Sequence, residues 1–410
     1  MSTATGPPAA LPERCDALII GGGAAGLALA ARLADSEFRR RRVIVVDDDS
    51  RPLADRAWAY WSDVAADTEA AGAQAFDRFW VRTGDAAHLV ELDRFRYRTV
   101  TGPELDRATD AALAGAPGFA RVRGQVSAVS DGPHGASVVV DGRTVRADWV
   151  FDSVGVRDPT RAGVGLPIRA AGSGHRLVFT GRRIETDVDV FDPCAPVLMD
   201  FRTGQGADLA FVYVLPAGPR VALVEHTRFT AAADVRPGAG DTALDAYLRD
   251  ILRVGTHRVL ATEHGTIPLV TTRPPRPGHR VVLIGTPAGM VRASTGYGYA
   301  RIQRHSAALA RSLATHGHPF DVPDAPARYR TLDRVLLEVI DREPARVVDV
   351  FARLFAASPG DRVLEFLDER TSVVQELALI LTLPPAPFLR AVAALITRPP
   401  SGRRARRPRP

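Results

Sequence analysis

The sequence predicts a mixed α/β (α+β) fold, and three features of the chain indicate it. The chain opens with a strand, a glycine-rich turn, a helix and a second strand, which is typical of a parallel sheet. A β-rich stretch follows over residues 176–270, and the chain is mostly helical after residue 298. Its 410 residues are too many for one small core, so we expect two or three domains.

The opening unit consists of two short apolar runs on either side of a helix. Residues 16–20 and 43–46 are rich in Ile, Leu and Val, as expected for parallel strands that are buried on both faces. The pattern predicts a helix over 27–34 between them. These three segments form a βαβ unit at the start of the fold.

The turn in this unit carries three glycines at the spacing G-x-G-x-x-G. Gly21 permits the tight turn, Gly23 lets a pyrophosphate approach the backbone, and Gly26 lets helix and strand pack closely. Asp47 ends the next strand, where an acid accepts hydrogen bonds from ribose hydroxyls. The alternative is a structural turn that binds no nucleotide. The sequence thus predicts a dinucleotide site at Gly21, Gly22, Gly23, Gly26 and Asp47.

The βαβ pattern does not repeat along the chain as it does in NAD dehydrogenases. Instead, a second glycine-rich loop over 285–296 follows a predicted strand at 281–284. This split order resembles the FAD-binding Rossmann fold of the glutathione-reductase type, in which a late loop closes on the flavin. The late loop supplies further candidate cofactor contacts at Gly285, Thr286, Gly289, Thr295 and Gly296.

The predicted domains follow from this order. We expect a discontinuous FAD-binding domain, a β-rich substrate domain, a C-terminal helical region and two disordered tails. The FAD-binding domain takes residues 13–60, 100–160 and 265–310, the substrate domain 61–99 and 161–264, the helical region 311–398, and the tails 1–12 and 399–410.

The composition limits the classes of binding partner that we expect for this protein. All 53 basic residues are arginine, against 47 acidic residues, which gives a formal charge of +6. A coding bias explains this, and a basic face for acidic lipids is the alternative. Nucleic acid is not expected, because the arginines are dispersed and no binding motif accompanies them. Cys15 and Cys194 form neither a zinc pattern nor a disulfide framework, so we expect no metal and a reduced, cytoplasmic setting.

Several short segments of the chain form an ordered set of motifs. They are Arg56–Trp61 (R-x-W-x-x-W), Tyr97–Arg98, Met199–Arg202 (M-D-F/W-R), Phe211–Pro216, Glu225–Thr227 (E-x-T), Glu263–Pro268 (E-x-G-x-I-P), Ile284–Tyr297, Phe366–Asp368 and Leu383–Pro384. In this order, the segments resemble those of bacterial FAD-dependent lycopene cyclases. The chain departs from the family at His226, where a second acid is frequent. Thr286 stands where related flavin hydroxylases carry Asp, which argues against a hydroxylase. The resemblance also adds Arg56 to the candidate cofactor contacts.

The resemblance implies that the ψ ends of lycopene are cyclised to β-ionone rings, giving γ-carotene and then β-carotene. This intramolecular lyase or isomerase reaction moves no net electrons. A terminal double bond is protonated, the ring closes through a carbocation, and a proton leaves the ring. The family's use of reduced FAD implies NADPH as an electron donor. A β ring and an ε ring are both compatible with these residues, since the two differ only in which proton leaves.

Glu225 is the predicted acid. On a strand over 221–225, Val221, Leu223 and Glu225 share one face, so the carboxyl lies on an apolar face at the strand end. Burial disfavours ionisation and raises the pKa of a carboxyl, which suits a proton donor. The alternative is an edge-strand glutamate that faces solvent. His226 is expected to point away.

Other polar and aromatic residues have two interpretations each. Asp200 either orients substrate or pairs with Arg202, and the pairing is favoured. Glu263 is either a capping acid or functional. The aromatic side chains of Trp58, Tyr60 and Trp61 either stabilise the carbocation through their π faces or fill the core. Predicted substrate contacts are Trp58, Tyr60, Asp200, Tyr213 and Tyr297.

Lycopene is insoluble in water, so we expect the protein to bind the membrane surface peripherally. No apolar stretch is long enough for a transmembrane helix. The C-terminal helices and the arginine-rich tail are candidate docking segments, although ordinary packing is favoured for 344–356. Alternative functions are a flavin monooxygenase, an isoprenoid-chain reductase, or a carotenoid-binding flavoprotein without turnover.

Overall fold

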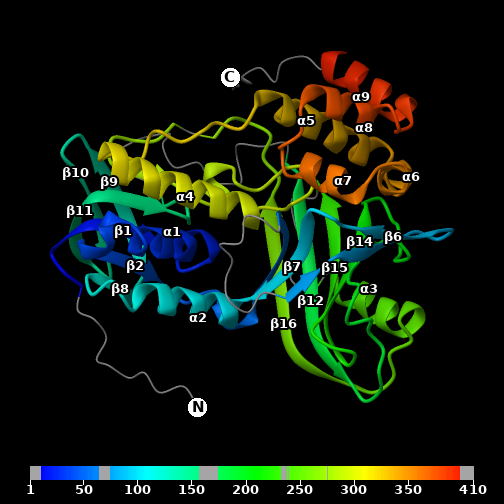
Figure 1. The fold of residues 1–410 in the computed structure, drawn as a ribbon, viewed down its shortest axis with the longest axis horizontal. Coiled ribbons are helices and arrows are strands. Elements are labelled where there is room, and N and C mark those ends of the chain that lie inside the picture. The colour runs from blue at the N-terminus through cyan, green and yellow to red at the C-terminus, as the bar shows by residue number, and fades with distance from the viewer. Residues whose placement is uncertain are drawn as a thin grey trace, which may run out of the picture.

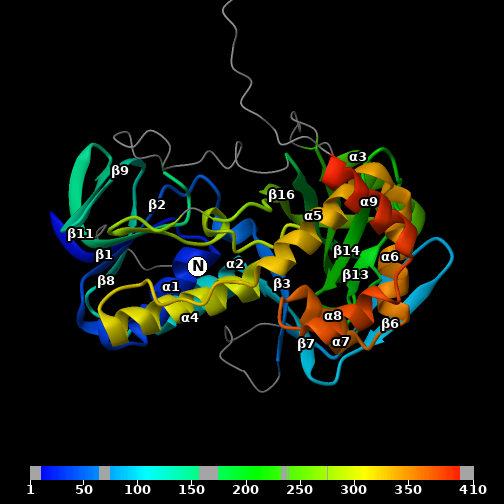
Figure 2. The ribbon, with the colours of Figure 1, turned by 90° about the horizontal axis from the view of Figure 1, so that it is seen from above.

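The computed structural model describes residues 11–63, 74–156, 174–231, 238, 240–274 and 276–397. A parallel sheet with its helices lies at one end of the molecule and a larger sheet at the other (Figure 1). Seen from above, α4 runs along the molecule toward the C-terminal helices that cover the second sheet (Figure 2).

The first sheet has a parallel core in the order β8-β2-β1-β11-β17, and β10 and β9 extend it antiparallel from the first half of β11. Its strands are β1 (Arg14–Ile20), β2 (Val43–Asp47), β8 (Phe119–Arg123), β9 (Val126–Gly132), β10 (Gly135–Val140), β11 (Arg143–Asp152) and β17 (Val281–Leu283). The apolar stretches of β1 and β2 are buried. The strands predicted at 16–20 and 43–46 are thereby confirmed.

Three helices flank this sheet. α1 (Ala24–Ala34) packs against α2 (Gly102–Leu113) and α4 (Tyr299–His316), which are distant in sequence. α1 begins three residues before the predicted start at Leu27, because Gly26 belongs to its first turn and contacts the preceding strand end. This early start places the helix N-terminus at the second glycine of the motif.

The second sheet has the order β16-β12-β15-β14-β13-β5-β6, and β3-β7-β4 form a small third sheet. The strands are β5 (Arg78–Arg82), β6 (Ala87–Glu91), β12 (Arg176–Thr186), β13 (Val197–Asp200), β14 (Ala210–Pro216), β15 (Val221–Thr230) and β16 (His257–Pro268), with β3 (Ala57–Asp63), β4 (Gln74–Phe76) and β7 (Phe95–Thr101) in the small sheet. β15 continues past its predicted end at Glu225, because β12 and β14 both pair with it further along. Glu225 is therefore in the middle of a strand.

The two faces of the second sheet are covered by different elements. Phe211, Tyr213 and Leu215 of β14 pack toward the C-terminal helices. The alternate residues Val212 and Val214 pack toward α3 (Asp241–Ala246) and the helical turn Tyr247–Ile251. Side-chain alternation along β14 thus separates a face under the C-terminal helices from a face under α3.

The C-terminal helices are α5 (Ala327–Arg342), α6 (Pro344–Ala356), α7 (Gly360–Leu367), α8 (Val373–Ile380) and α9 (Pro385–Thr397). Val347, Phe351 and Leu354 of α6 are buried on one face of the helix. α8 is short, because Ser372 caps its start and the chain turns before Pro384.

The predicted tails lie mostly outside the described residues, which begin at residue 11 and end at residue 397. Leu11, which the sequence assigns to the N-terminal tail, instead packs against the apolar cluster that contains Leu18 and Val150. Within the described part of the chain, no single helix is long and apolar enough to span a membrane. α8 and α9 pass that test of length and composition only as a pair, bent by 115°.

Candidate active site

Two glutamates meet across one glycine in the second sheet. Gly181 of β12 pairs with Glu225 of β15 on one side and with Glu263 of β16 on the other. Directly paired residues share a face, so both carboxyl side chains rise from the face that carries Gly181. A Cβ atom at Gly181 would lie 3.0 Å from Cγ of Glu263 and 3.2 Å from Cδ1 of Leu223. The missing side chain at Gly181 therefore leaves the space in which the carboxyl groups meet.

Burial favours the protonated form of both carboxyls. Burial raises the pKa of Glu225, while hydrogen bonds from Glu263 and Thr227 oppose the rise. Burial also raises the pKa of Glu263, and the charge of Glu225 raises it further, against the Ala57 N–H and Arg56. Because ionised carboxylates only accept hydrogen bonds, a hydrogen bond between them requires a proton on one of them.

Thr227 and His226 follow the acid on opposite faces of β15. The buried Thr227 hydroxyl donates a hydrogen bond of 3.1 Å to Oε1 of Glu225. His226 points away from Glu225, as the sequence predicts, and burial lowers the pKa of its imidazole to about 4. His226 is therefore neutral at physiological pH and is separated from the carboxyl pair by the sheet.

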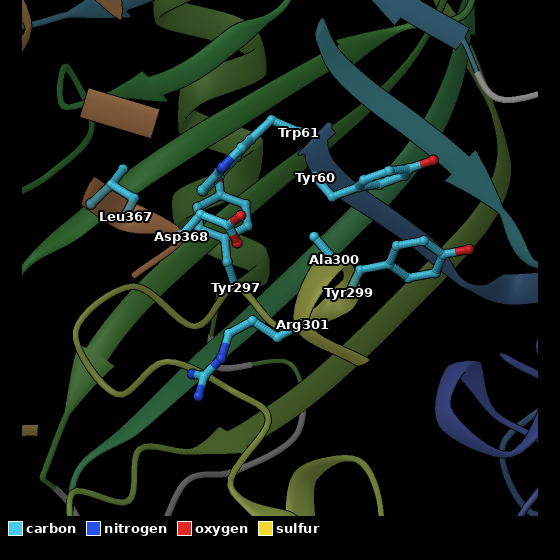
Figure 3. Close-up of a pocket in the computed structure, with 9 residues that line it drawn as sticks. Tyr60, Trp61, Tyr297, Tyr299, Ala300, Arg301, Leu367 and Asp368 are labelled. Carbon is cyan, nitrogen blue, oxygen red and sulfur yellow. The ribbon is translucent and has the colours of Figure 1, made fainter. Parts of the chain in front are cut away.

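An aromatic wall stands beside Glu225. Tyr213 pairs with Glu225 across the strands, and Trp61 pairs with Tyr97 in the small sheet. The Tyr297 ring contacts both groups, with its centroid 4.6 Å from that of Trp61 and 6.4 Å from that of Tyr213. Figure 3 shows Trp61 and Tyr297 close together on one side of a small crevice.

The polar atoms of this wall are enclosed. Burial raises the pKa of the Tyr97, Tyr213 and Tyr297 hydroxyls, so all three stay protonated. The three hydroxyls lie close enough to interact, yet those of Tyr97 and Tyr297 have no hydrogen bond of ordinary geometry within the described part of the chain. The same is true of the Trp61 indole N–H. The wall is therefore an apolar enclosure that exposes aromatic rings to the acid.

Two predicted substrate contacts lie elsewhere. Alternation along β3 turns Trp58 and Tyr60 away from Trp61, and both pack against Tyr299 at ring-centroid distances of 5.9 and 4.5 Å. Figure 3 shows Tyr60 and Tyr299 directed away from Trp61. They join an apolar cluster with Leu27 of α1. The structure thus groups Trp58 and Tyr60 with the glycine-turn helix and places Trp61 near Glu225.

Asp200 is a structural residue on the other face. Its carboxylate accepts hydrogen bonds from Arg202 at 2.6 Å and from the Tyr247 hydroxyl at 2.7 Å. Asp200 is completely buried, and Tyr247 belongs to the cluster under α3. The pairing with Arg202 that the sequence favours is present, and Asp200 lies under α3, on the opposite face of the sheet from Glu225.

The glycine turn has the close approaches that its motif requires. A Cβ atom at Gly26 would lie 1.9 Å from the carbonyl oxygen of Gly21, and Gly21 itself has a φ of +98°. The Gly22 N–H donates to Oδ2 of Asp47, and α1 starts at Gly23 without a side-chain cap. The first N–H groups of α1 are thus available to an anion.

The late loop and Arg56 complete this site. Gly285, with a φ of +63°, approaches Ala25 so closely that an added Cβ would lie 2.8 Å from the Ala25 Cβ. The Arg56 guanidinium lies 3.6 Å from the position of a Cβ at Gly23, and the charges of Asp47 and Glu263 both act on it. These residues fit a dinucleotide with its phosphates between the turn and Arg56.

The remaining late-loop candidates lie further along the loop. Thr286 starts the short 3-10 turn Thr286–Ala288, and Gly289 ends it with a φ of +71°. The Thr295 hydroxyl accepts a hydrogen bond of 3.3 Å from the Tyr297 N–H. Gly296 lies against Leu177 of β12. The loop thus links the glycine-turn region to the strand that separates the two glutamates.

A cavity of about 110 Å³ is lined by residues from both parts of the site. Its walls include Arg56, Thr99, Leu215, Leu223 and Glu263. Glu263 of the carboxyl pair and the arginine beside the glycine turn therefore border the same cavity. Among the described residues, no cluster of His, Cys, Asp or Glu is suited to a metal ion.

The sequence assigns no role to Gly181 or Thr227, and it leaves Glu263 as either a capping acid or a functional residue. Thr227 and Glu263 both lie in segments that carry the family resemblance, which could have indicated them. Gly181 carries no motif, and only the order β16-β12-β15 shows that it separates two acids.

Comparison with known proteins places the chain in a family. The family described as lycopene cyclase protein matches residues 16–393. A lycopene beta-cyclase from Paracoccus sp. (strain N81106 / MBIC 01143) is 28% identical over 234 residues, which cover 54% of this chain and 60% of that protein.

Solved structures show the same fold at low identity. A geranylgeranyl bacteriochlorophyll reductase-like protein from Thermoplasma acidophilum has a TM-score of 0.57 and 16% identity, covering 93% of this chain and 96% of its own. A flavoprotein/dehydrogenase from Cytophaga hutchinsonii has a TM-score of 0.58 and 14% identity, and the match covers 94% of this chain and 99% of that chain. The flavin-dependent monooxygenase PieE, solved with FAD and substrate, has a TM-score of 0.58 and 17% identity, covering 94% and 72%.

These likenesses confirm an FAD-binding Rossmann-type fold, and the family match extends over most of the chain. The chain belongs to the lycopene cyclase family.

Proposed function

We propose that this protein is a lycopene beta-cyclase that closes the ψ ends of lycopene into β-ionone rings, with Glu225 as the acid. The observation that carries the proposal is the position of the half-buried Glu225 carboxyl, which lies between Tyr213 of the aromatic wall and Glu263 and has a pKa that burial raises. Protonating a carbon–carbon double bond creates a carbocation, which water would trap. An acid beside an apolar aromatic wall supplies the proton and keeps water away from the cation.

Each step can be assigned to residues of the site. The Glu225 carboxyl gives its proton to the terminal double bond, and the tertiary cation is then attacked by the next double bond to close the ring. The π faces of Trp61, Tyr213 and Tyr297 stabilise the cation. The ring then loses a proton to the Glu225 carboxylate, which restores the acid, so neither electrons nor protons are consumed.

FAD is the proposed cofactor, held by the glycine turn, Asp47, Arg56 and the late loop. When bound in its reduced form, it supplies negative charge that stabilises the developing cation. We propose NADPH as the donor that keeps it reduced. The Arg56 guanidinium binds the pyrophosphate and lies between the cofactor site and Glu263.

The test is product analysis under anaerobic conditions. Purified protein is incubated with lycopene in liposomes while dithionite keeps FAD reduced. We expect γ-carotene and then β-carotene, with no stoichiometric use of NADPH. Unchanged lycopene in the presence of bound, reduced flavin would contradict the proposal, and NADPH use in step with product would indicate a monooxygenase or a reductase instead.

We also propose that α8 and α9 dock the protein on the cytoplasmic membrane surface. Seven large apolar side chains on these helices are exposed, including Val374 and Ile396, both at 77%, and Leu381, which directly follows α8, is 83% exposed. The only charged residues of the two helices are the buried Glu376, paired with Arg328, and Arg390, paired with Glu343.

The occupant of this surface is a lipid bilayer with anionic headgroups. An uncharged apolar surface matches the interior of the headgroup layer. Five arginines between 403 and 409 follow α9 in the sequence, although they lie outside the described residues. Basic residues beside an apolar helix favour anionic lipids. The position also suits a substrate that dissolves only in the bilayer.

Sedimentation with liposomes tests the docking surface. We expect V374D/L381D to lose binding to phosphatidylcholine and phosphatidylglycerol vesicles alike, and truncation after residue 398 to weaken binding to phosphatidylglycerol only. V188D is the matched control, because Val188 is 64% exposed on the connection after β12. Unaltered sedimentation of V374D/L381D would contradict the assignment.

A further inference from the structure

The two glutamates of the site are not equivalent in their hydrogen bonds. Glu225 accepts from the Thr227 hydroxyl and faces Glu263 across Gly181. The Ala57 N–H lowers the pKa of Glu263, but the buried Oε1 atom of Glu263 has no hydrogen-bond partner among the described residues. More donors stabilise the ionised form of a carboxyl group, so Glu225 is the member of the pair that ionises more readily.

The charged groups around the pair support the same asymmetry. Among the charges that act on Glu263 in the described part of the chain, the cation is Arg56, which Asp47 also attracts. Arg183, two residues from Gly181 on β12, lines the same cavity together with Asp55 and Glu104. The aromatic wall on the other side of Glu225 contributes tyrosines that stay protonated. The negative charge of an ionised Glu225 therefore raises the pKa of Glu263, so that Glu263 keeps its proton.

We propose that Glu263 is a protonated positioning residue, which holds the Glu225 carboxyl across Gly181 and donates a hydrogen bond to the carboxylate that remains after proton transfer. This inference rests on the proposed acid role of Glu225. The pair starts with two protons, gives one to the substrate from Glu225, and regains one when the ring loses its proton. Glu263 keeps its proton throughout and makes Glu225 a stronger acid than an isolated buried carboxyl.

Two variants of Glu263 should differ in kcat and in their pH profiles. In E263L the donor is absent, so we expect kcat to fall about 10- to 100-fold and the alkaline limb of the pH profile to move upward by about one unit. In E263Q the amide still donates, so we expect kcat within about threefold of wild type and an unmoved limb. If Glu263 were instead ionised, E263Q would remove a negative charge and move the limb downward.

A measurement without substrate separates this inference from the proposed function. Difference infrared spectroscopy of the purified flavoprotein follows protonated carboxyl groups across a pH series. We expect a carboxylic acid band that E263Q and E263L both remove at neutral pH, and a titration of Glu225 that moves upward only in E263L. E185Q is the matched control, since Glu185 is paired with Arg258 at the exposed end of the same β12 strand.

Each outcome decides one of the two claims. If the infrared band and the Glu225 titration behave as expected but the wild type forms no cyclised product, the pairing of Glu225 with Glu263 stands and the proposed cyclase activity is rejected. An active wild type whose Glu225 titration is unmoved in E263L, or moves downward in E263Q, would overturn the role given to Glu263.

Discussion

Glu225 of β15 and Glu263 of β16 lie on one face of the second sheet, and Gly181 of the strand between them places only a hydrogen atom between their side chains. The side chains come from strands that are not neighbours, so the pair exists only because β12 is inserted between them. Any side chain at position 181 would occupy the space in which the carboxyls meet.

Gly181→Ala should therefore separate the pair. The added methyl group would contact Glu263 and Leu223, which we expect to lower the free energy of unfolding by about 1–3 kcal/mol. Displacement of the acid should reduce cyclisation on the order of 100-fold. Chemical denaturation and product formation check the two effects. Gly218→Ala is the control, because no atom lies within 4 Å of the added Cβ, and it should change neither quantity.

Thr227→Val removes the hydroxyl that donates to Oε1 of Glu225. Without this donor the pKa of Glu225 should rise further, and Glu225 becomes a weaker acid. We expect kcat to fall about tenfold and the alkaline limb to move upward, since a hydrogen bond to a charged group is worth about 1.5–3 kcal/mol. Thr227→Ser keeps the hydroxyl and should restore both. Equal pH profiles for the Val and Ser variants would show that the Thr227 hydroxyl does not affect the acidity of Glu225.

The pH dependence of stability should reflect the carboxyl pair. Both glutamates have a pKa that is raised in the folded chain, so their stabilising contribution is complete below the ordinary glutamate pKa and is lost as the pH rises through the folded values. A one-unit difference in pKa corresponds to about 1.4 kcal/mol. The double variant E225Q/E263Q should thus become increasingly more stable than wild type from about pH 4 upward. Thermal unfolding over a pH series measures this, and parallel curves for the two proteins would contradict it.

Gly26→Ala should prevent cofactor binding. Its added Cβ would lie 1.9 Å from the Gly21 carbonyl oxygen, so either the turn or the start of α1 must move. We expect purified G26A to contain less than about a tenth of the wild-type flavin, because the phosphate-binding N–H groups are displaced. Gly115→Ala, which meets no atom within 4 Å, should retain its flavin. Normal flavin content in G26A would place the cofactor elsewhere.

Local patterns were enough to predict the glycine turn and the face of Glu225. The choice of Asp47 among three consecutive aspartates rested on strand register, and its carboxylate does accept the Gly22 N–H. Period-two alternation placed Glu225 on an apolar face, although the strand proved longer. Both are local properties of one or two elements.

The partners of these residues depend on sheet order and could not be predicted in the same way. Glu263 is 38 positions after Glu225, and no local pattern shows that a third strand lies between them. Alternation separates Trp58 from Trp61, but only the packing of β3 between α1 and the acid decides which faces Glu225. Asp200 was ambiguous until α3 was seen to cover its face.

The most direct test of the central claim compares Glu225→Gln with wild type, both loaded with reduced FAD and supplied with lycopene in liposomes. The amide preserves the size of the side chain but has no acidic proton to transfer to the double bond. We expect the variant to retain flavin and to bind lycopene while it forms no γ-carotene or β-carotene. Cyclised product at the wild-type rate from this variant would contradict the assignment of Glu225 as the acid.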